Sequence, residues 1–448
     1  MSRYTNKMNG VRRAGAAGLA AVVAASLAAC GGGGDGSSSS GTAAADGGTF
    51  TILQYEDPTT PQGEGWKVAL DLFKEKHPDV TVDFQATSFD GFRKNAKLTL
   101  GGNKVPDVIE FNKGNADGGQ LAAQGLLDPL TEAVEKFGWD EKVTGSMLSF
   151  AKYDANGNAG DGDWYGIPNV GEYATFFYNK DMFAEAGITE VPDSIEGFEA
   201  AMDKLLAKGI TPIASSAATN QGFNQLWLWY GLVSAYADRQ DIDDFMFVRD
   251  PVDFEADPWK KGTEKFQEWI DKGYVGTDLA GLTFEQATVN FLSGKAAMVL
   301  WNQSIYNRVH DEAPFEWGSF TFPGANLGLG SSGHLWGVPA KSANKDLAYD
   351  WIDITLSPEV QNAIGERGGL PIVVDLDVID DPATKLYTEG YVEMIDKDAF
   401  SFYPDYPVPG FLDFQQTHMA AMSNKNETAA EFLPQLQTFY DDGTADAR

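Results

Sequence analysis

Short apolar runs alternate with amphipathic segments through the first third of the chain. Thr49–Gln54 has the pattern of a strand, and Gly65–Lys76 repeats apolar residues at helical spacing. Val80–Gln85 and Phe89–Leu100 repeat this strand–helix pair, and Val105–Phe111 has the pattern of a further buried strand. Such alternation predicts an α/β fold with a mainly parallel sheet wound by helices.

The same pattern continues after residue 170. It predicts the strands Tyr173–Tyr178, Gly209–Ala214 and Lys295–Trp301, and the helices Asp181–Ala186, Ile195–Lys208, Gln225–Tyr236, Thr283–Gly294 and Lys345–Leu356.

The segment between these two halves has some features of a calcium-binding loop. Asp154, Asn156 and Asn158 have the spacing of its first ligands. Its sixth position is Ala159 instead of glycine, and its twelfth is Tyr165 instead of glutamate. With Asn-Gly at residues 156–157, a β-hairpin is the favoured interpretation, and we expect no metal here.

The N-terminus has the pattern of an export signal. Met1–Arg13 contains only basic charges, Ala14–Ala29 is a short run of small apolar residues, and Cys30 is the only cysteine of the chain. Residues 27–30 (LAAC) resemble the lipobox of bacterial lipoproteins, in which the cysteine becomes the lipidated N-terminus. We therefore expect a signal peptide over residues 1–29, lipidation at Cys30, and a Gly/Ser-rich tether over residues 30–48.

Charge and length limit the possible partners. The chain has 448 residues and a net charge of −32, which argues against nucleic acid and anionic lipid as ligands. A body of about 400 residues exceeds what one hydrophobic core supports, so two lobes are expected. A single cysteine permits no internal disulfide.

The sequence contains no recognisable catalytic motif. GxSxG, HExxH and P-loop patterns are absent, no GxGxxG pattern follows a predicted strand, and the four histidines lie far apart. Abundant carboxylates would allow a two-acid glycoside hydrolase, so that alternative stays open. We expect a protein that is not an enzyme and uses no cofactor.

The ends of the predicted strands are the first places to look for a binding site. In parallel sheets, ligands lie outside the carboxyl ends of the strands. This rule selects Tyr55 and Glu56 after the first strand, Asp90 at the head of a helix, and Asn112 after the third strand. A second candidate is the stretch Gly330–Ala340 (GSSGHLWGVPA), in which small residues surround a histidine and a tryptophan.

Four ordered motifs identify a family resemblance. They are PDVI at residues 106–109, YGIP followed by FYNKDMF and AGI between residues 165 and 188, FLSGKAAM at residues 291–298, and WGVPAKS followed by SPEVQ between residues 336 and 361. Together they closely resemble the family 1 extracellular solute-binding proteins, the sugar-binding lipoproteins of ABC importers. The resemblance covers the chain from about residue 48 to its end.

The resemblance implies two doubly wound domains joined by a hinge of several crossings, the type II clamp of periplasmic binding proteins. Residues 49–168 with 338–375 would form lobe 1, and residues 169–337 with 376–448 would form lobe 2. The crossings are expected near residues 168–170, near residues 337–340 and after about Val373. The implied protein is a monomer on the outer face of the cell membrane that delivers a carbohydrate to membrane permease subunits.

Sugar chemistry then selects the candidate residues. A sugar has apolar ring faces and a rim of hydroxyls, so its site needs flat aromatic side chains and polar groups around them. The candidates are Tyr55, Glu56, Asp90, Asn112, Glu172, Tyr173, Asn224, Trp227, Trp229, Trp301, Asn302, Ser332, Gly333, His334, Trp336 and Arg367. Trp227 and Trp229 lie about 200° apart on a helix, so at least one should belong to the core.

The length of the chain and its many tryptophans favour an oligosaccharide over a monosaccharide. The same fold with a peptide, amino acid or polyamine as ligand is the main alternative, because an acidic protein also attracts cations.

Overall fold

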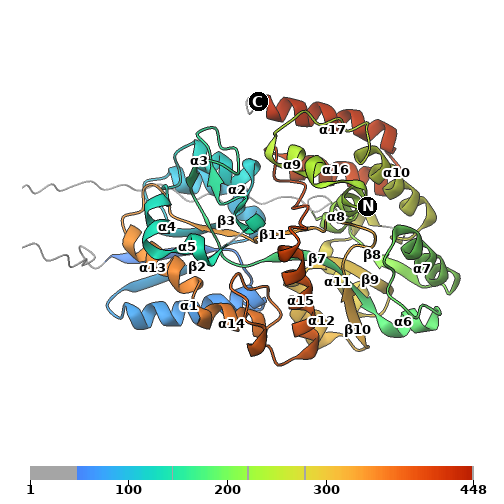
Figure 1. The fold of residues 1–448 in the computed structure, drawn as a ribbon, viewed down its shortest axis with the longest axis horizontal. Helices are drawn as coiled ribbons and strands as arrows, with labels where there is room; N and C mark the ends of the chain where they lie inside the picture. The colour runs from blue at the N-terminus through green and yellow to red at the C-terminus, as the bar shows by residue number, and fades with distance from the viewer. Residues whose placement is uncertain (1–47, 144, 219–220, 277–278, 446–448) are drawn as a thin grey trace, which may run out of the picture. The chain divides into compact units, whose positions relative to one another are not determined.

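Two mixed sheets, each flanked by helices, form the part of the protein that the structure describes (Figure 1). The computed structural model describes residues 48–143, 145–218, 221–276 and 279–445. The predicted signal peptide, Cys30 and nearly all of the tether lie outside these residues. No helix in the described ranges is long and apolar enough to cross a membrane.

The first sheet has the strand order β2-β1-β3-β12-β6. Its strands are β1 (Thr49–Gln54), β2 (Thr81–Ala86), β3 (Val108–Phe111), β6 (Ile167–Pro168) and β12 (Leu335–Gly337). β1 pairs in parallel with β2 and β3, as the alternating pattern predicts, whereas β12 runs antiparallel to β3 and β6. We call this sheet with its helices the first lobe.

The second sheet has the order β10-β7-β9-β8, and β11 also pairs with β7. Its strands are β7 (Glu172–Asn179), β8 (Thr211–Ala214), β9 (Ala296–Asn302), β10 (Trp317–Phe320) and β11 (Gly330–Ser331). Only β8 and β9 are parallel, so the prediction of a mainly parallel sheet is wrong here. β7 enters directly from the first sheet without a crossover helix, which leaves it free to run antiparallel to its neighbours. This sheet with its helices is the second lobe.

Each helix predicted from the sequence is present and differs mainly at its ends. The helices at residues 131–142, 239–247, 259–272, 306–312 and 358–366, and the three between residues 382 and 444, were not predicted. The α-helices are α1 (Pro61–Lys76), α2 (Phe89–Gly101), α3 (Gln120–Ala123), α4 (Thr131–Phe137), α5 (Trp139–Lys142), α6 (Lys180–Glu185), α7 (Ile195–Ala207), α8 (Phe223–Tyr236), α9 (Arg239–Phe247), α10 (Trp259–Lys272), α11 (Phe284–Leu292), α12 (Tyr306–Glu312), α13 (Lys345–Thr355), α14 (Pro358–Glu366), α15 (Pro382–Asp396), α16 (Phe411–Ser423) and α17 (Ala429–Thr444). α1 begins four residues before its predicted start because Thr60 caps Gly63 N–H and Pro61 occupies the first turn.

Shorter helical turns connect these elements. A π-helical turn η1 (Asn115–Gly119) precedes α3, and the 3₁₀ turns are η2 (Gly145–Leu148), η3 (Leu279–Gly281), η4 (Gln303–Ile305) and η5 (Leu376–Val378).

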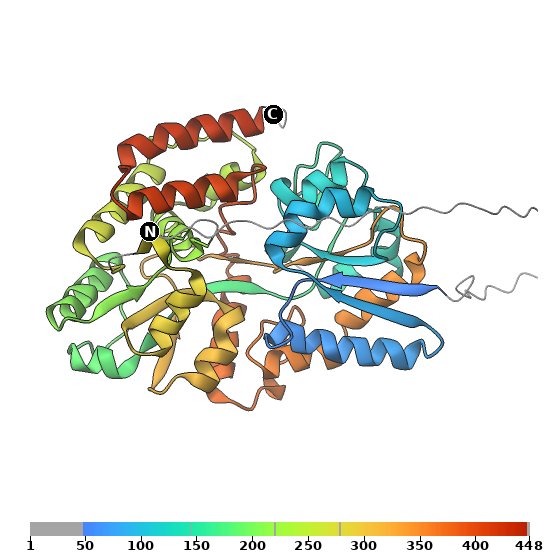
Figure 2. The same ribbon diagram turned by 180° about the vertical axis from the view of Figure 1, so that it is seen from behind.

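Alternation along the strands divides the first lobe into two cores. Phe50, Ile52 and Val108 pack with α1, α13 and α14, whereas Leu53 and Ile109 pack with α2 and α3 on the opposite face (Figure 1). A larger aromatic core surrounds the second sheet, and α16 and α17 pack against each other beside it (Figure 2). Each sheet is thereby packed against helices on the faces next to the strand ends where the candidate residues lie.

The predicted β-hairpin is confirmed. β4 (Lys152–Tyr153) and β5 (Asp163–Trp164) pair antiparallel, and the Asp154 carboxylate accepts hydrogen bonds from the backbone N–H groups of Asn156 and Asn158. The carboxylate therefore stabilises the turn, the role that the hairpin interpretation requires.

Gly157 in this hairpin cannot be replaced without damage. Its φ is +85°, and a Cβ atom would lie 2.3 Å from the Gly119 carbonyl oxygen. We expect Gly157→Ala to lower the free energy of unfolding by about 2–5 kcal/mol, from left-handed strain and overpacking together. Gly125 is the matched control, since its φ is +64° and nothing lies within 4 Å of the position that a Cβ atom would take. Gly125→Ala should cost only about 1–2 kcal/mol. Equal losses for the two variants in urea unfolding would contradict this explanation.

The chain passes between the lobes at short segments. Residues 169–171 lead from β6 into β7, near the first predicted crossing. Residues 332–334 lead back from β11 to β12, earlier than the predicted 337–340, because β12 is already paired with β3. The full lobe boundaries stay a prediction.

Candidate functional site

A cavity of about 220 Å³ lies where strand ends of both sheets meet. The first lobe contributes residues that follow β1, that precede β12, and that lie at the starts of α1 and α2. The second lobe contributes residues at the start of β7, at and after the end of β9, and at the start of α8. The lining residues are Tyr55, Glu56, Gln62, Phe89, Glu172, Phe223, Trp227, Trp301, Asn302, Gln303, Ser304 and His334. Seven of them were selected from the sequence: Tyr55, Glu56, Glu172, Trp227, Trp301, Asn302 and His334.

Two tryptophans form an aromatic wall of the cavity. The rings of Trp227 and Trp301 have centroids 4.6 Å apart, and Phe284 stacks behind Trp301 at 5.0 Å with an interplanar angle of 6°. The Trp301 indole N–H donates to the Ser304 hydroxyl at 2.9 Å, which fixes the orientation of the ring. Such a wall offers a flat apolar surface held in place before any ligand arrives.

The first-lobe side of the cavity carries a histidine–carboxylate pair. His334 Nδ1 lies 3.0 Å from Glu56 Oε1, and the Tyr55 ring packs against the imidazole with centroids 4.7 Å apart. The phenyl ring of Phe89 stacks on the imidazole at 5.6 Å and also contacts the Tyr55 ring at 5.5 Å. The imidazole is therefore fixed in place and presents a polar edge to the cavity.

Two glutamine amides supply unused hydrogen-bonding groups. Gln62 and Gln303 are nearly fully buried and line the cavity, yet Gln62 Oε1 and both polar atoms of the Gln303 amide have no partner among the described residues. Buried polar atoms are almost always paired, so these atoms favour a polar ligand. Sequence reasoning missed both residues, although Gln303 directly follows β9 and the strand-end rule could have found it.

A buried ion pair joins the two lobes beside the cavity. Lys113, fully buried after β3, lies 3.4 Å from Glu172 Oε2 at the start of β7. Asn302 Nδ2 donates to the other carboxylate oxygen of Glu172 at 3.2 Å. Burial lowers the pKa of Lys113, and the Glu172 carboxylate opposes that shift. Glu172 thus acts mainly as the counter-ion of Lys113.

The loop after α15 also contacts the first lobe. Tyr406 carbonyl oxygen accepts a hydrogen bond from Ala116 N–H at 2.9 Å, and the Tyr406 ring lies 5.2 Å from Lys113 Nζ. Asp405 is buried near Arg93 and Asp117, and burial raises the pKa of its carboxyl group to about 6, although Arg93 acts in the opposite direction.

This raised pKa gives a pH-dependent stability. The folded protein holds a proton on Asp405 between about pH 4 and pH 6, where the unfolded chain has released it, so this contribution to stability falls as the pH rises through that window. Asp405→Asn removes the contribution. The unfolding free energy of the variant minus that of wild type should therefore be about 3 kcal/mol higher at pH 7.5 than at pH 4. Urea unfolding of both proteins at these pH values measures the difference, and a constant difference would contradict the assignment.

The remaining candidates do not line the cavity, and several predictions are corrected. Trp336, Trp229 and Tyr173 are core residues with almost no exposed surface. Trp336 packs between Trp66 and Trp351, and Trp229 donates its indole N–H to the Thr263 hydroxyl at 2.9 Å. As helix geometry predicts, Trp227 and Trp229 face different ways.

Several polar candidates form hydrogen bonds or ion pairs with other residues of the protein. Asn224 Nδ2 donates to the Leu300 carbonyl oxygen, and Asn112 Nδ2 donates to Asp117. Arg367 pairs with Glu64 at 2.9 Å with its side chain 60% exposed. The other candidates outside the lining are Asp90, on the first turn of α2, and Ser332 and Gly333, in the buried segment between β11 and β12.

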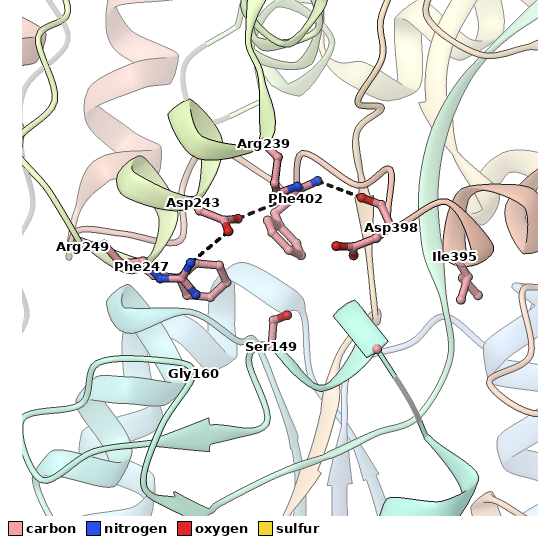
Figure 3. Close-up of a pocket in the computed structure, with 10 residues that line it drawn as sticks. Ser149, Gly160, Arg239, Asp243, Phe247, Arg249, Ile395, Asp398 and Phe402 are labelled. Atoms are coloured by element: carbon pink, nitrogen blue, oxygen red, sulfur yellow. Dashed lines mark hydrogen bonds and ion pairs between the residues drawn. The ribbon is translucent and has the colours of Figure 1, made fainter.

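A second, larger cavity of about 380 Å³ lies elsewhere, lined by Ser149 and Gly160 and by residues of α9 and of the segment 395–402 (Figure 3). Arg239 and Arg249 both contact Asp243 there, and Arg239 also donates to the Asp398 carbonyl oxygen. The two arginines of this cavity therefore share the carboxylate of Asp243. The smaller cavity combines flat aromatic rings with unpaired amides, and we regard it as the candidate site.

Comparison with known proteins decides the family. The family model described as bacterial extracellular solute-binding protein matches residues 57–362. This chain belongs to the bacterial extracellular solute-binding proteins. Members of this family bind solutes and are not enzymes, which removes the glycoside hydrolase alternative.

Relatives of this solute-binding protein are distant. A probable sugar-binding periplasmic protein of Mesorhizobium japonicum is 24% identical over 58% of this chain and 60% of its own length. The multiple sugar-binding protein of Streptococcus mutans is 22% identical, over 69% of this chain and 76% of its own.

Solved structures share the two-lobed fold. A chitin oligosaccharide binding protein has a TM-score of 0.76 at 21% identity, covering 89% of this chain and 99% of that chain. The GacH receptor of Streptomyces glaucescens, solved unliganded and with acarbose, has a TM-score of 0.71 at 20% identity, with the same coverage. The expectation of an α/β clamp is thereby confirmed.

Proposed function

We propose that this protein captures a sugar, and specifically an oligosaccharide, in the cavity between Trp227, Trp301 and the Glu56–His334 pair. The observation that carries the proposal is a single cavity lined both by the aromatic wall and by Gln62 and Gln303, whose amides have unpaired atoms. A sugar ring would stack on the indoles, and its hydroxyls would pair with the amides and with the Glu56–His334 edge. The names of several relatives refer to sugars, which supports the same proposal.

Charge pairing favours a neutral ligand over a cation. Both carboxylates of the lining have a basic partner: His334 lies 3.0 Å from Glu56, and Lys113 lies 3.4 Å from Glu172. A polyamine or basic peptide would have to compete with these partners. Among the described lining residues no lysine or arginine is present to hold a carboxylate, which an amino acid would require.

The cavity volume supports a ligand that extends beyond it. About 220 Å³ is below the roughly 300–1,000 Å³ of pockets that enclose a drug-sized molecule. We infer that one end of an oligosaccharide enters the cavity while the remainder lies outside. The protein would then deliver the sugar to the permease of an ABC importer while anchored to the membrane through lipidated Cys30.

A thermal-shift screen tests the proposed ligand class. Neutral oligosaccharides, spermidine and short peptides would be added separately to the purified protein. A sugar present at 100 times its Kd should stabilise the fold by about 2.7 kcal/mol and raise the Tm. Stabilisation by spermidine or a peptide and by no sugar would overturn the proposal.

Ligand capture should also bring the lobes together. The cavity is lined from both lobes, so a sugar that contacts both favours the closed form over the open one. Small-angle scattering should show a smaller radius of gyration when the sugar found in the screen is added. An unchanged radius at saturation would contradict closure.

A further inference from the structure

Three side chains converge at one edge of the first sheet. Glu110 lies in β3, Glu56 lies two residues after β1, and His334 directly precedes β12. β1 is parallel to β3 and β12 is antiparallel to it, so the end of β1 and the start of β12 meet at the carboxyl end of β3. One ligand atom from each of the three residues lies within 4.8 Å of the other two.

The Glu110 carboxylate has no cationic partner among the described residues. Its side chain is almost completely buried, and its hydrogen-bond donors are Tyr55 N–H at 3.3 Å and Asn169 Nδ2 at 2.6 Å. Both donors are neutral, and Lys113 is engaged by Glu172. His334 already pairs with Glu56, so the buried Glu110 carboxylate, which does not line the cavity, is left without a cation of its own.

A second observation also indicates a missing ligand. The Asn169 side chain is fully buried, and its Oδ1 atom has no partner in the described structure. The same amide touches Glu110 through Nδ2, so an unpaired oxygen lies beside the cluster. The buried hydroxyl group of Tyr55, the residue before Glu56, is also unpaired. Unpaired buried oxygens around a carboxylate pair are suitable additional ligands or water anchors for a metal ion.

The geometry points to a divalent-metal site formed by Glu56, Glu110 and His334, with zinc as the ion that fits its donors best. One imidazole nitrogen and two carboxylate oxygens are typical zinc ligands, whereas calcium takes six to eight oxygens. Tetrahedral zinc holds its ligand atoms about 3.4 Å apart. His334 Nδ1 and Glu56 Oε1, at 3.0 Å, would separate slightly, and an atom pair at the 4.8 Å limit of the cluster would close by about 1.4 Å. Glu56 lines the cavity and is only partly enclosed, so it has room for that movement.

A proton is the competing occupant. Burial, and secondarily the Glu56 carboxylate, raises the pKa of Glu110 well above its ordinary value, so without a metal ion a proton would neutralise the cluster. The two possibilities can be distinguished. A metal site takes up zinc at neutral pH, whereas a cluster that only holds a proton does not.

Zinc titration of the tag-free, chelator-stripped protein tests the site. We expect one zinc ion per chain by calorimetry and a raised Tm. His334→Asn and Glu110→Gln should each weaken zinc binding at least tenfold, since loss of even an outer-shell partner costs about 10–100-fold. His77→Asn is the matched control. His77 lies 3.0 Å from Asp350, and this pair is partly buried, like the His334–Glu56 pair. It should leave zinc binding unchanged.

No zinc uptake by the wild type would overturn the inference, and so would wild-type affinity in both cluster variants. If Glu110→Gln fails to fold by circular dichroism, His334→Asn alone decides. Sugar binding is measured separately, in the presence of a chelator. The metal site does not depend on the proposed function, so failure of one can be distinguished from failure of the other. Retained sugar binding without zinc uptake would leave that function standing.

Discussion

Replacing Trp301 by alanine is expected to weaken sugar binding roughly 30-fold, which corresponds to about 2 kcal/mol. The indole forms the cavity wall with Trp227 and is held between the Phe284 ring and the Ser304 hydroxyl. Alanine removes the flat surface and leaves the neighbouring rings without support. Calorimetric titration with the tightest sugar from the screen measures the change, and Trp301→Phe should recover part of the affinity.

Trp317 provides the control for a general effect of losing a tryptophan. It lies in β10, packs against Tyr306, and does not line the cavity. Trp317→Ala should lower stability while leaving sugar affinity near that of the wild type. Equal loss of affinity in the Trp317 and Trp301 variants would show that the cavity wall has no special role.

Replacing Glu172 by alanine should destabilise the fold by about 3 kcal/mol. The Lys113 ammonium group is fully buried, and the substitution leaves it without its counter-ion. Breaking a buried ion pair on one side costs about 3–5 kcal/mol, and the lower end applies because Asp405 and Glu56 still attract Lys113. Urea unfolding at pH 7 measures the loss.

The double variant Lys113→Met with Glu172→Gln separates charge from packing. It removes both charges and keeps an acceptor for Asn302, so most of the lost stability should return. Asp271→Asn is the surface control, since Asp271 and Lys425 lie 3.0 Å apart with side chains 56% and 61% exposed. That change should cost less than about 1 kcal/mol. A double variant as unstable as Glu172→Ala would contradict the charge explanation.

Local periodicity predicted the central strands of both sheets and several of the helices beside them, because these elements have clear boundaries in the sequence. Thr49–Gln54 was predicted to the residue, and α7 ends one residue before its predicted end. The antiparallel pairing in the second sheet was not predicted, since strand direction depends on contacts far apart in the sequence. β7 pairs with β9 more than a hundred residues later in the chain.

The candidate site was found in part because strand ends carry ligand groups in this fold class. Tyr55, Glu56 and Asn302 follow this rule, and the structure brings them to one cavity. Gln62 was missed because it lies on the first turn of α1, where a polar residue gives no sign of burial.

Trp336 illustrates a limit of sequence reasoning. His334 lies two residues earlier, directly before β12, and its ring packs against Tyr55 and Phe89. Trp336 lies within β12 and is covered by Trp66 of α1, whereas His334 lies beyond the strand end and reaches the cavity. The sequence shows that both residues lie at or near a strand end, but only the position of the covering helix separates the core residue from the cavity residue.

The most direct test of sugar capture is a crystal structure of the protein with the tightest-binding sugar of the screen. We predict one sugar ring stacked on Trp227 and Trp301, with hydroxyls paired to Gln62, Gln303 and the Glu56–His334 edge. A sugar seated elsewhere, for example in the cavity of Arg239 and Ser149 in Figure 3, would contradict the assignment of the site.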